Sequence, residues 1–427
     1  MKRLLVIVLA CCATAGCVSN PWTMRSRAKL PPPHDIAVFM DGTANDFESR
    51  TNVMKLNLIL SEDAGDTVDT FYVEGIGAKD KLVGAATGWG FRYRIKQAYA
   101  YLLMNHHERD RVFLFGFSRG AYSARVLASL LHYGGLPVEP VAKEARARQI
   151  ADVLFDAYKG DISDELRRKR IAAAQARLGL EFRPATVEFM GLWDTVESMG
   201  LPDEDEDVEG ENRQYADQLC NVRKAAHAMS LDDNRAWDFT PILLTRRHLL
   251  HHCTRTPDGE PWTYTDEAAD AWLDAKVDEV WFSGAHSDVG GGYEEGRLSG
   301  VSLNWMLAKL RAYGIAADHP GVNEDLTSEL HDPQEAMKIY RRKPRSLERY
   351  ALESGYNGGK LKLHPTVLSR LSALRVDGPI VDGKRTDGLR SPAGLGSRLF
   401  KPCFRPLGGE RFLFDPEPDL CRLTVAN

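Results

Sequence analysis

The sequence predicts an α/β fold in which helices cover a mostly parallel central sheet. Three features carry this prediction: short apolar runs recur along the chain, segments with helical periodicity separate them, and one run leads through a glycine-rich turn directly into a helix. Parallel strands cannot be joined by a tight hairpin and need a crossover, usually a helix. Regular alternation of the two elements therefore favours a parallel sheet.

The predicted strands are strand-like runs rich in apolar residues, and the run 112–115 has no polar face, as expected of a strand that is buried on both sides of a sheet. They cover residues 36–40, 68–73, 112–115, 187–193 and 277–282. Apolar residues spaced at i, i+3, i+4 and i+7 mark helices at 121–131 and 150–158 between them. This order of strands and helices is that of a single layered sheet.

The domain organisation follows from where this alternation begins and ends. It extends over residues 36–320, which we predict to form one domain, with a charged helical pair at 140–182 as an insertion. Residues 321–427 are polar and rich in Gly and Pro, so we expect a C-terminal extension there. A net charge of −5 and the lack of a basic stripe argue against a nucleic-acid partner.

Residues 1–17 have the pattern of an export signal. A basic start precedes an apolar run at 4–13, which is shorter than the roughly 20 residues that a membrane-spanning helix needs. The run leads to "TAGC", which resembles a bacterial lipoprotein signal with Cys17 as the lipidated residue. A plain signal peptide cut near Ala15 is the alternative. We expect an exported protein that a lipid anchor holds to a membrane of the bacterial envelope.

Two further features concern the exported state. Residues 18–35 include three consecutive prolines and are expected to act as a semi-rigid tether. The cysteines that follow Cys17 are Cys220, Cys253, Cys403 and Cys421. Export permits disulfides, and the pair Cys403–Cys421 is favoured because both residues lie in the extension. Unpaired buried thiols stay open as an alternative.

The turn in "RVFLFGFSRGAYSAR" (111–125) carries the most specific chemical signal. Ser118 lies between Gly116 and Gly120 in a G-x-S-x-G pattern, with a predicted strand before it and a predicted helix after it. This is the pattern of a nucleophile elbow, in which small neighbours let strand and helix approach and a sharp turn exposes the serine hydroxyl. The backbone N–H of Arg119 would then face a developing oxyanion.

A nucleophilic serine needs a histidine to accept its proton and a carboxylate to orient that histidine. In a sheet of this kind both residues follow later strands, at the edge where the strands end. Asp194 comes directly after the predicted strand 187–193, and His286 comes shortly after 277–282. We therefore predict Asp194 as the acid and His286 as the base.

Other residues compete for these roles. His227 and His248 lie in stretches with helical or polar character and no adjoining strand end. Asp288 is only two residues from His286 and is better placed to fix its own loop than to reach the ring. The predicted chemistry requires neither a metal ion nor a cofactor.

The loop after the first strand, in "IAVFMDGTAND", is the expected source of a second oxyanion donor. Gly42 and Thr43 are the candidates, while Asp41 with Asn45 is expected to shape the loop. A phosphatase of the haloacid dehalogenase type would need an aspartate nucleophile at the position of Phe39, so that alternative is excluded.

Four stretches resemble, in order, the motifs of an α/β-hydrolase family whose best-known members are phospholipase effectors of bacterial type VI secretion. They are "FMDGTAND", "GFSRGAYSAR", "GLWDTVES" and "VWFSGAHSDVGGGY". The likeness extends over roughly residues 36–316. It includes "AHAMSLDDNRAWDFTP" at 226–241, where the family has a similar helix followed by acidic residues and an arginine.

The resemblance implies an α/β-hydrolase core, a catalytic triad at Ser118, Asp194 and His286, and hydrolysis of phospholipid acyl esters. One departure concerns the biological role: injected effectors do not normally need a signal peptide, which favours a resident envelope enzyme. A carboxylesterase or thioesterase for soluble substrates is one alternative. A non-catalytic lipoprotein that binds lipid or a partner protein is the other.

Overall fold

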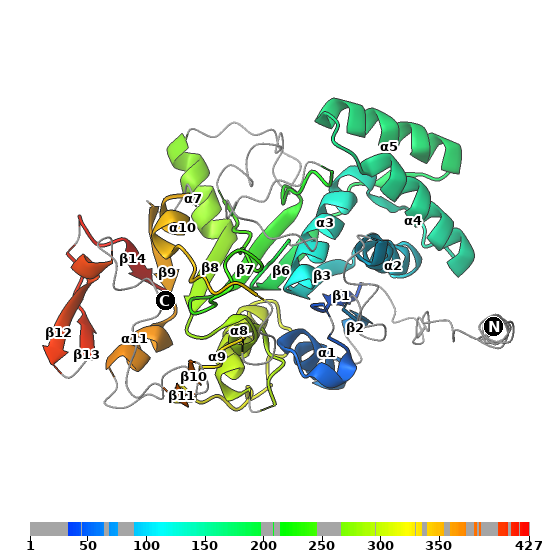
Figure 1. Cartoon of the computed structure of the whole chain (residues 1–427). Helices are drawn as coiled ribbons and strands as arrows, with labels where there is room; N and C mark the ends of the chain where they lie inside the picture. Colours follow the sequence, from blue (N-terminus) through cyan, green and yellow to red (C-terminus); the bar gives the residue numbers. More distant parts are fainter. Residues whose placement is uncertain are drawn as a thin grey trace, which may run out of the picture.

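An eight-stranded sheet, in which every neighbouring pair of strands is parallel, forms the centre of the structure (Figure 1). The computed structural model describes residues 33–43, 45–63, 68–75, 89–197, 208, 214–245, 266–294, 296–328, 330–334, 340–353, 359–372, 380–381, 384–385, 400–408, 411–417 and 419–426. The strand order is β14-β9-β8-β7-β6-β3-β1-β2. In chain order the strands of this sheet are β1 (Asp35–Met40), β2 (Val68–Val73), β3 (Arg111–Phe117), β6 (Val187–Trp193), β7 (Val222–Ser230), β8 (Val277–Phe282), β9 (Leu361–Leu363) and β14 (Leu423–Val425).

The sheet confirms the predicted fold class, an α/β-hydrolase fold with a parallel sheet between layers of helices. All the strands predicted from apolar runs are present, and those at 68–73, 187–193 and 277–282 have the predicted bounds. The sequence pattern did not reveal β7, β9 or β14.

Side chains of the central strands alternate between two hydrophobic cores. Val112 and Leu114 of β3 pack in the core on one face of the sheet, whereas Phe113 and Phe115 pack in the core on the other. Because successive side chains of a strand point to opposite faces, a strand covered on both sides buries side chains at successive positions. This is why β3 appears in the sequence as the unbroken apolar run 112–115.

Helices cover both faces of the sheet. The helices of the first core are α2 (Trp89–Asn105), α3 (Arg119–Gly134), α4 (Glu144–Tyr158), α5 (Asp164–Leu178) and α7 (Asp266–Lys276). The second core lies under α1 (Asn52–Asp63), the short α8 (His286–Gly290) and α9 (Arg297–Arg311). The helical pair α4 and α5 falls in the predicted insertion and packs outside α2 and α3 (Figure 1). The two-residue strands β4 (Leu136–Pro137) and β5 (Phe182–Arg183) pair at its base.

The helix expected within residues 226–241 is not present at 226–230, where the chain is part of a strand. Residues 222–230 form β7, the strand between β6 and β8. Its alanines favour a helix in isolation, but small side chains also fit a central strand that is packed closely on both faces. The tertiary position of this segment therefore overrides its local propensity.

The C-terminal extension adds to the same sheet. Its strands β9 and β14 pair with each other, and β9 pairs with β8. Its helices are α10 (Leu347–Glu353) and α11 (Pro365–Ser372), and its small strands are β10 (Ile380–Val381), β11 (Lys384–Arg385), β12 (Phe404–Gly408) and β13 (Arg411–Phe414). A disulfide joins Cys403 and Cys421, as the sequence analysis favoured. Cys220 is also disulfide-bonded.

Several predictions for the ends of the chain fall outside the described residues. These include the export signal 1–17, Cys17 and most of the tether 18–35. Among the residues that the structure describes, no helix is both long and apolar enough to cross a membrane.

Candidate active site

Ser118 forms the turn between β3 and α3 by itself. The strand ends at Phe117 and the helix begins at Arg119, so one residue reverses the direction of the backbone. Ser118 consequently has φ 57° and ψ −128°, a conformation that a side chain with a Cβ atom rarely adopts. Its N–H donates to Trp193 O at 2.9 Å, which ties the turn to the end of the neighbouring strand β6.

Gly116 and Gly120 lie where the backbone leaves no space for a side chain. A Cβ atom at Gly116 would come within 2.5 Å of Ala121 Cα, and one at Gly120 would come within 2.1 Å of Met40 O. Both distances are far shorter than any real contact, so the strand and the helix can make this turn only with glycine at these positions.

Asp194 and His286 are brought together from different strands. Asp194 directly follows β6, and His286 is the first residue of α8, after β8. Asp194 Oδ2 and His286 Nδ1 lie 2.6 Å apart, and both side chains are buried. The imidazole lies between the rings of Phe117 and Phe239, with centroid distances of 4.6 and 5.0 Å. Carboxylate and rings together fix the orientation of the imidazole.

Arg345, which the sequence analysis did not identify, holds the other side of the Asp194 carboxylate. Its Nη1 donates to Asp194 Oδ1 at 2.7 Å and its Nη2 donates to Oδ2 at 2.9 Å, with both side chains fully buried. The N–H of Ser230, the last residue of β7, also donates to Oδ1 at 2.9 Å. Burial raises the pKa of Asp194, but the charge of Arg345 and the hydrogen bond from His286 lower it by more. The pKa therefore lies well below its usual range, and the carboxylate stays ionised.

Arg345 reaches this position because its segment docks on the loop after β7. Lys343 N donates to Asn234 O at 2.7 Å, and Ala236 N donates to Lys343 O at 2.9 Å. Arg345 itself donates to the backbone carbonyl of Phe239 at 3.1 Å. No local motif surrounds Arg345, so no signal in the sequence could have linked it to Asp194.

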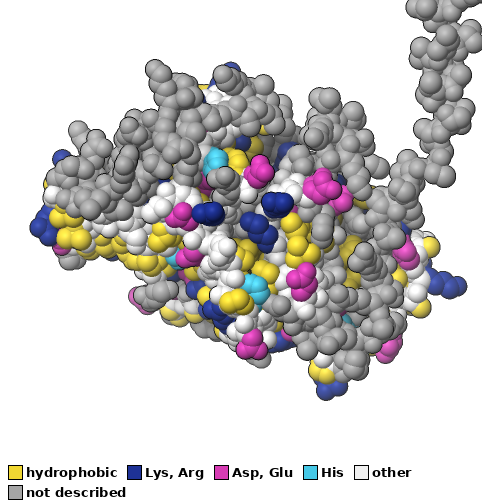
Figure 2. Space-filling view, turned by 90° about the horizontal axis from the view of Figure 1, so that it is seen from below, with side chains coloured by type: hydrophobic (Ala, Val, Ile, Leu, Met, Phe, Trp, Pro, Cys, Tyr) yellow, Lys and Arg dark blue, Asp and Glu magenta, His cyan; other side chains and the backbone are white. Residues whose placement is uncertain are grey.

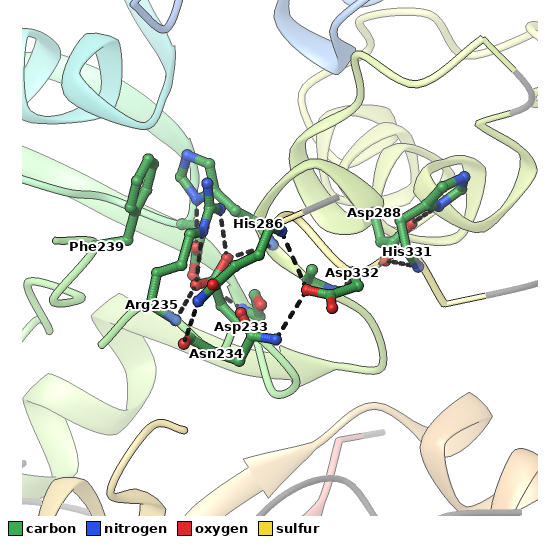
Figure 3. Close-up of polar contacts among 12 residues, drawn as sticks. Asp233, Asn234, Arg235, Phe239, His286, Asp288, His331 and Asp332 are labelled. Carbon is green, nitrogen blue, oxygen red and sulfur yellow. Dashed lines mark hydrogen bonds and ion pairs between the residues drawn. The ribbon is translucent and has the colours of Figure 1, made fainter. Parts of the chain in front are cut away.

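The loop after β7 also positions His286 (Figure 3). The N–H of His286 donates to Asp233 Oδ2 at 3.2 Å, and Arg235 pairs with the same carboxylate at 2.6 Å. The guanidinium of Arg235 lies 3.7 Å from the centre of the Phe239 ring, which in turn contacts the imidazole. Acidic and cationic side chains of one short loop thus hold the backbone and the ring of His286.

Asp288 contacts its own loop and does not bind the His286 ring through any described hydrogen bond. Its Oδ2 accepts from the N–H of Ala285 at 2.9 Å, and its Oδ1 lies 2.6 Å from Nδ1 of His331. The Tyr293 ring stacks on His331 at 3.9 Å. This geometry places Asp288 in the support of the loop that carries His286.

The expectation that His227 lies in a helical or polar stretch is wrong. His227 is a buried residue of β7, and its Nδ1 lies 2.9 Å from Glu279 Oε2. Its Nε2 accepts from the N–H of Thr195 at 3.1 Å, so Nδ1 carries the proton and donates to Glu279. Both ring nitrogens of His227 therefore have partners, and one of them positions Thr195, the residue next to Asp194. His248 lies outside the described residues.

The loop after β1 lies beside Ser118 and contains the two predicted oxyanion donors, Gly42 and Thr43. A Cβ atom at Gly42 would be 3.2 Å from Ser118 Cβ, which shows how close the loop comes. The Gly42 N–H, however, already donates to Asp41 Oδ1 at 2.7 Å, so it is not available to an oxyanion. Thr43 Oγ1 is buried and has no hydrogen-bond partner among the residues that the structure describes. The Gly42 contact argues against Gly42 as the donor, and Thr43 stays a prediction.

Asp41 shapes this loop from beneath. The hydroxyls of Thr51 and Tyr72 each donate to Asp41 Oδ2 at 2.6 Å. Burial raises the pKa of Asp41 to about 6, although these hydrogen bonds oppose the shift. Its contacts are those of a residue that fixes the backbone at Gly42.

The comparison with known protein families gives the class of the chain. The sequence model of the family described as "T6SS, Phospholipase effector Tle1-like, catalytic domain" matches residues 34–309. A relative in Saccharomyces cerevisiae, the uncharacterized protein YEL023C, is 22% identical over 431 residues. The alignment covers 72% of this chain and 60% of the relative, so the chain spans less than two thirds of that protein.

Solved structures with a similar course of the chain are distant. An uncharacterized protein from Pseudomonas aeruginosa is 18% identical with a TM-score of 0.36, covering 66% of this chain and 46% of that one. The Tle1 effector bound to the VgrG spike is 18% identical with a TM-score of 0.28, covering 61% and 51%. A thermophilic esterase from Thermogutta terrifontis is 11% identical with a TM-score of 0.32, covering 69% and 87%.

The family match decides the assignment. It covers well over half of the chain and includes Ser118, Asp194 and His286, whereas Arg345 lies beyond it. It also confirms the resemblance carried by the four sequence motifs. The chain therefore belongs to the family of Tle1-like catalytic domains of type VI secretion phospholipase effectors, a family of lipolytic hydrolases.

Proposed function

We propose that the protein is a serine hydrolase that cleaves carboxylic esters through an acyl-enzyme, with Ser118 as nucleophile, His286 as general base and Asp194 as the residue that orients the imidazole. The observation that carries this proposal is the 2.6 Å contact between Asp194 and His286 Nδ1, at the same edge of the sheet as the strained turn at Ser118. Because Nδ1 faces the carboxylate, Nε2 is the nitrogen left to accept the serine proton.

The reaction would proceed in two halves. Ser118 Oγ attacks the ester carbonyl while His286 takes its proton, and His286 then returns that proton to the departing alcohol. Water, activated by the same imidazole, releases the acid from the serine. The tetrahedral oxyanion of each half would be bound by the backbone N–H of Arg119, in the first turn of α3, and by Thr43.

The pH dependence follows from the environment of His286. Burial lowers the pKa of His286, although the Asp194 carboxylate opposes the shift. The imidazole is then neutral, and able to act as a base, at every pH above this lowered pKa. We expect the acid limb of the kcat/KM profile, where the imidazole takes up a proton, to be centred below the ordinary histidine value of about 6.5. A pH–rate profile with a soluble ester measures this, and an acid limb centred above about 6.5 would contradict it.

Phospholipid acyl esters are the proposed substrate class, because the family is one of phospholipase effectors. One face of the molecule carries Lys and Arg, Asp and Glu, and hydrophobic side chains interspersed near its centre (Figure 2). At a lipid surface the cations of this face would meet phosphate groups and its apolar side chains would meet the acyl region, whereas its acidic side chains would be repelled by anionic lipids. Soluble acyl esters remain the competing substrates.

The proposed location is the bacterial envelope, with the chain anchored through a lipidated Cys17 and held off the membrane by the tether 18–35. The sequence of residues 1–17 supports export. The disulfide Cys403–Cys421 is compatible with an oxidising compartment. A resident enzyme acting on the cell's own lipids or on imported esters fits these features better than an injected toxin.

The substrate is tested with the full-length protein, purified in detergent and added to vesicles of phosphatidylethanolamine and phosphatidylglycerol. We expect release of fatty acid and lysophospholipid, detected by mass spectrometry, at a rate above that for a soluble butyrate ester. Turnover of the soluble ester alone would assign a carboxylesterase. Absence of turnover together with absence of labelling by a fluorophosphonate probe would favour the non-catalytic lipoprotein.

A further inference from the structure

Two histidines and an aspartate meet at the amino end of the sheet, away from the candidate active site. His34 directly precedes β1 and Asp110 directly precedes β3, and the strands pair in parallel with Asp35 opposite Arg111. His107 comes from the connection between α2 and β3. Asp110 and Ser118 flank the seven residues of β3 and are eight residue steps of about 3.3 Å apart, so the cluster lies roughly 26 Å from Ser118.

The three side chains converge on a common point. One potential ligand atom of each lies within 4.8 Å of the other two. His34 Nδ1 is 3.2 Å from Asp110 Oδ1, and His107 Nδ1 is 3.4 Å from Asp110 Oδ2. The Asp110 side chain is fully buried and that of His34 is 7% exposed, whereas that of His107 is 28% exposed. The point is therefore enclosed but can be reached from solvent beside His107.

Within the described part of the chain, neither histidine has a hydrogen bond of good geometry at its Nδ1 atom. Both atoms are buried, and a carboxylate oxygen lies close to each. The carboxylate is held by the backbone N–H groups of His34 at 3.0 Å and His107 at 2.7 Å. Each carboxylate oxygen has a second lone pair left. Buried polar atoms without partners are costly, so such a set is expected to have a further ligand.

The spacing is close to that of the ligands of a tetrahedral metal ion. Bonds of about 2.0–2.1 Å to nitrogen and oxygen place neighbouring ligand atoms roughly 3.3 Å apart in a tetrahedron. His34 Nδ1 lies 3.2 Å from Asp110 Oδ1 and His107 Nδ1 lies 3.4 Å from Asp110 Oδ2, so each nitrogen is near this distance from a different oxygen of the carboxylate. An ion bound through one of these oxygens would draw the second imidazole closer to it. Two imidazoles and one carboxylate are a ligand set that zinc accepts, with water in the fourth position.

We propose that His34, His107 and Asp110 form a zinc site that fastens the start of β1 to the connection between α2 and β3. The site lies where the tether 18–35 joins the domain, so the ion anchors the first strand at the point where a membrane-held chain would pull on it. It is independent of the proposed ester hydrolysis. Without zinc, a protonated His34 paired with Asp110 would be the competing arrangement.

The test is a zinc titration of the full-length protein, prepared without a polyhistidine tag, stripped with a chelator and kept in detergent. Binding is measured by competition with a chromophoric zinc chelator. The variants are His107→Ala and Asp110→Asn, and His319→Ala, a histidine outside the cluster that accepts from Gly321 N, is the matched control. We expect one zinc ion per chain in the parent and the control, and at least about tenfold weaker binding in both cluster variants.

Thermal unfolding gives the second readout. Zinc should raise the melting temperature of the parent protein and of His319→Ala, because the ion binds the folded state, and at the same zinc concentration it should raise that of the cluster variants by less. The parent titration decides the matter even if a variant fails to fold. No saturable uptake by the parent, or equal uptake by His107→Ala, would overturn the proposal. If the parent binds no zinc while Asp110→Asn melts lower, the cluster is an ion pair between protein groups.

Discussion

Ser118→Ala is expected to lose ester hydrolysis by about 10⁴-fold or more in kcat/KM while keeping its fold. The hydroxyl is the only group that the change removes, and the proposed acyl-enzyme cannot form without it. Ser118 is the N-cap residue of α3, but its side chain makes no capping hydrogen bond, so its oxygen contributes little to the stability of that helix. The rate on a soluble ester and adduct formation with a fluorophosphonate probe measure the loss. Retained turnover would move the nucleophile elsewhere.

A control and a second substitution separate chemistry from folding. Ser123→Ala removes a buried hydroxyl from the same helix, one that donates to Arg119 O, and should keep near-normal activity. Ser118→Gly should be inactive yet more stable than the parent by about 1 kcal/mol, because glycine adopts φ 57° without strain. A lower melting temperature for Ser118→Gly than for Ser118→Ala would contradict the strain at the turn.

Arg345→Met is expected to lower the free energy of unfolding by about 3–5 kcal/mol, because it leaves the buried Asp194 carboxylate without its cation. The stabilisation has a defined sign with pH. The folded-state pKa of Asp194 is depressed, so its contribution is present above the unfolded value of about 3.9 and is lost as the pH falls below it. Chemical denaturation at neutral and acidic pH measures this difference.

The matched control is Arg342→Met. Arg342 pairs with Asp332 at 2.8 Å, but its side chain is 38% exposed, so its loss should cost at most about 1 kcal/mol. Equal stabilities of the two variants would show that the pair at Asp194 contributes no more than a surface ion pair. Arg345→Lys, which keeps the charge but not the two parallel hydrogen bonds, should fall between them.

A positioning role of Arg345 has a separate kinetic signature. Its positive charge close to the Asp194–His286 pair disfavours protonation of the imidazole. In Arg345→Met, measured at a temperature where the variant is folded, the acid limb of the kcat/KM profile should therefore move to higher pH. An unshifted limb in a folded variant would limit Arg345 to stability.

The motif around Ser118 could be predicted because its determinants are local. Gly116, Ser118 and Gly120 lie within five consecutive residues, and the apolar run before them and the helical spacing after them are visible without knowledge of the fold. The positions of Asp194 and His286 followed from a general property of parallel sheets, whose loops at the carboxyl end lie side by side. The structure places these two residues in contact.

The strand β7 shows where local signals fail. Its alanines and its polar residues at one end give no strand pattern, and only its place between β6 and β8 makes it a strand. For the same reason His227 was predicted to lie in a helical or polar stretch. It is a residue of β7, and its ring accepts a hydrogen bond from the N–H of Thr195. Burial of β7 on both faces is a property of the assembled sheet, so no short stretch of the sequence could predict it.

The sequence by itself determined the layered parallel fold, the turn at Ser118 and the family of the chain, because each is encoded in patterns that span a few residues to a few dozen. The tertiary structure alone decided that Arg345 clamps Asp194, that Gly42 gives its N–H to Asp41, and that His34 and His107 meet at Asp110. These contacts depend on how distant segments are placed in space. Their energies arise from burial and charge at the points where segments meet, and the type of a single residue does not show which distant residue it will contact.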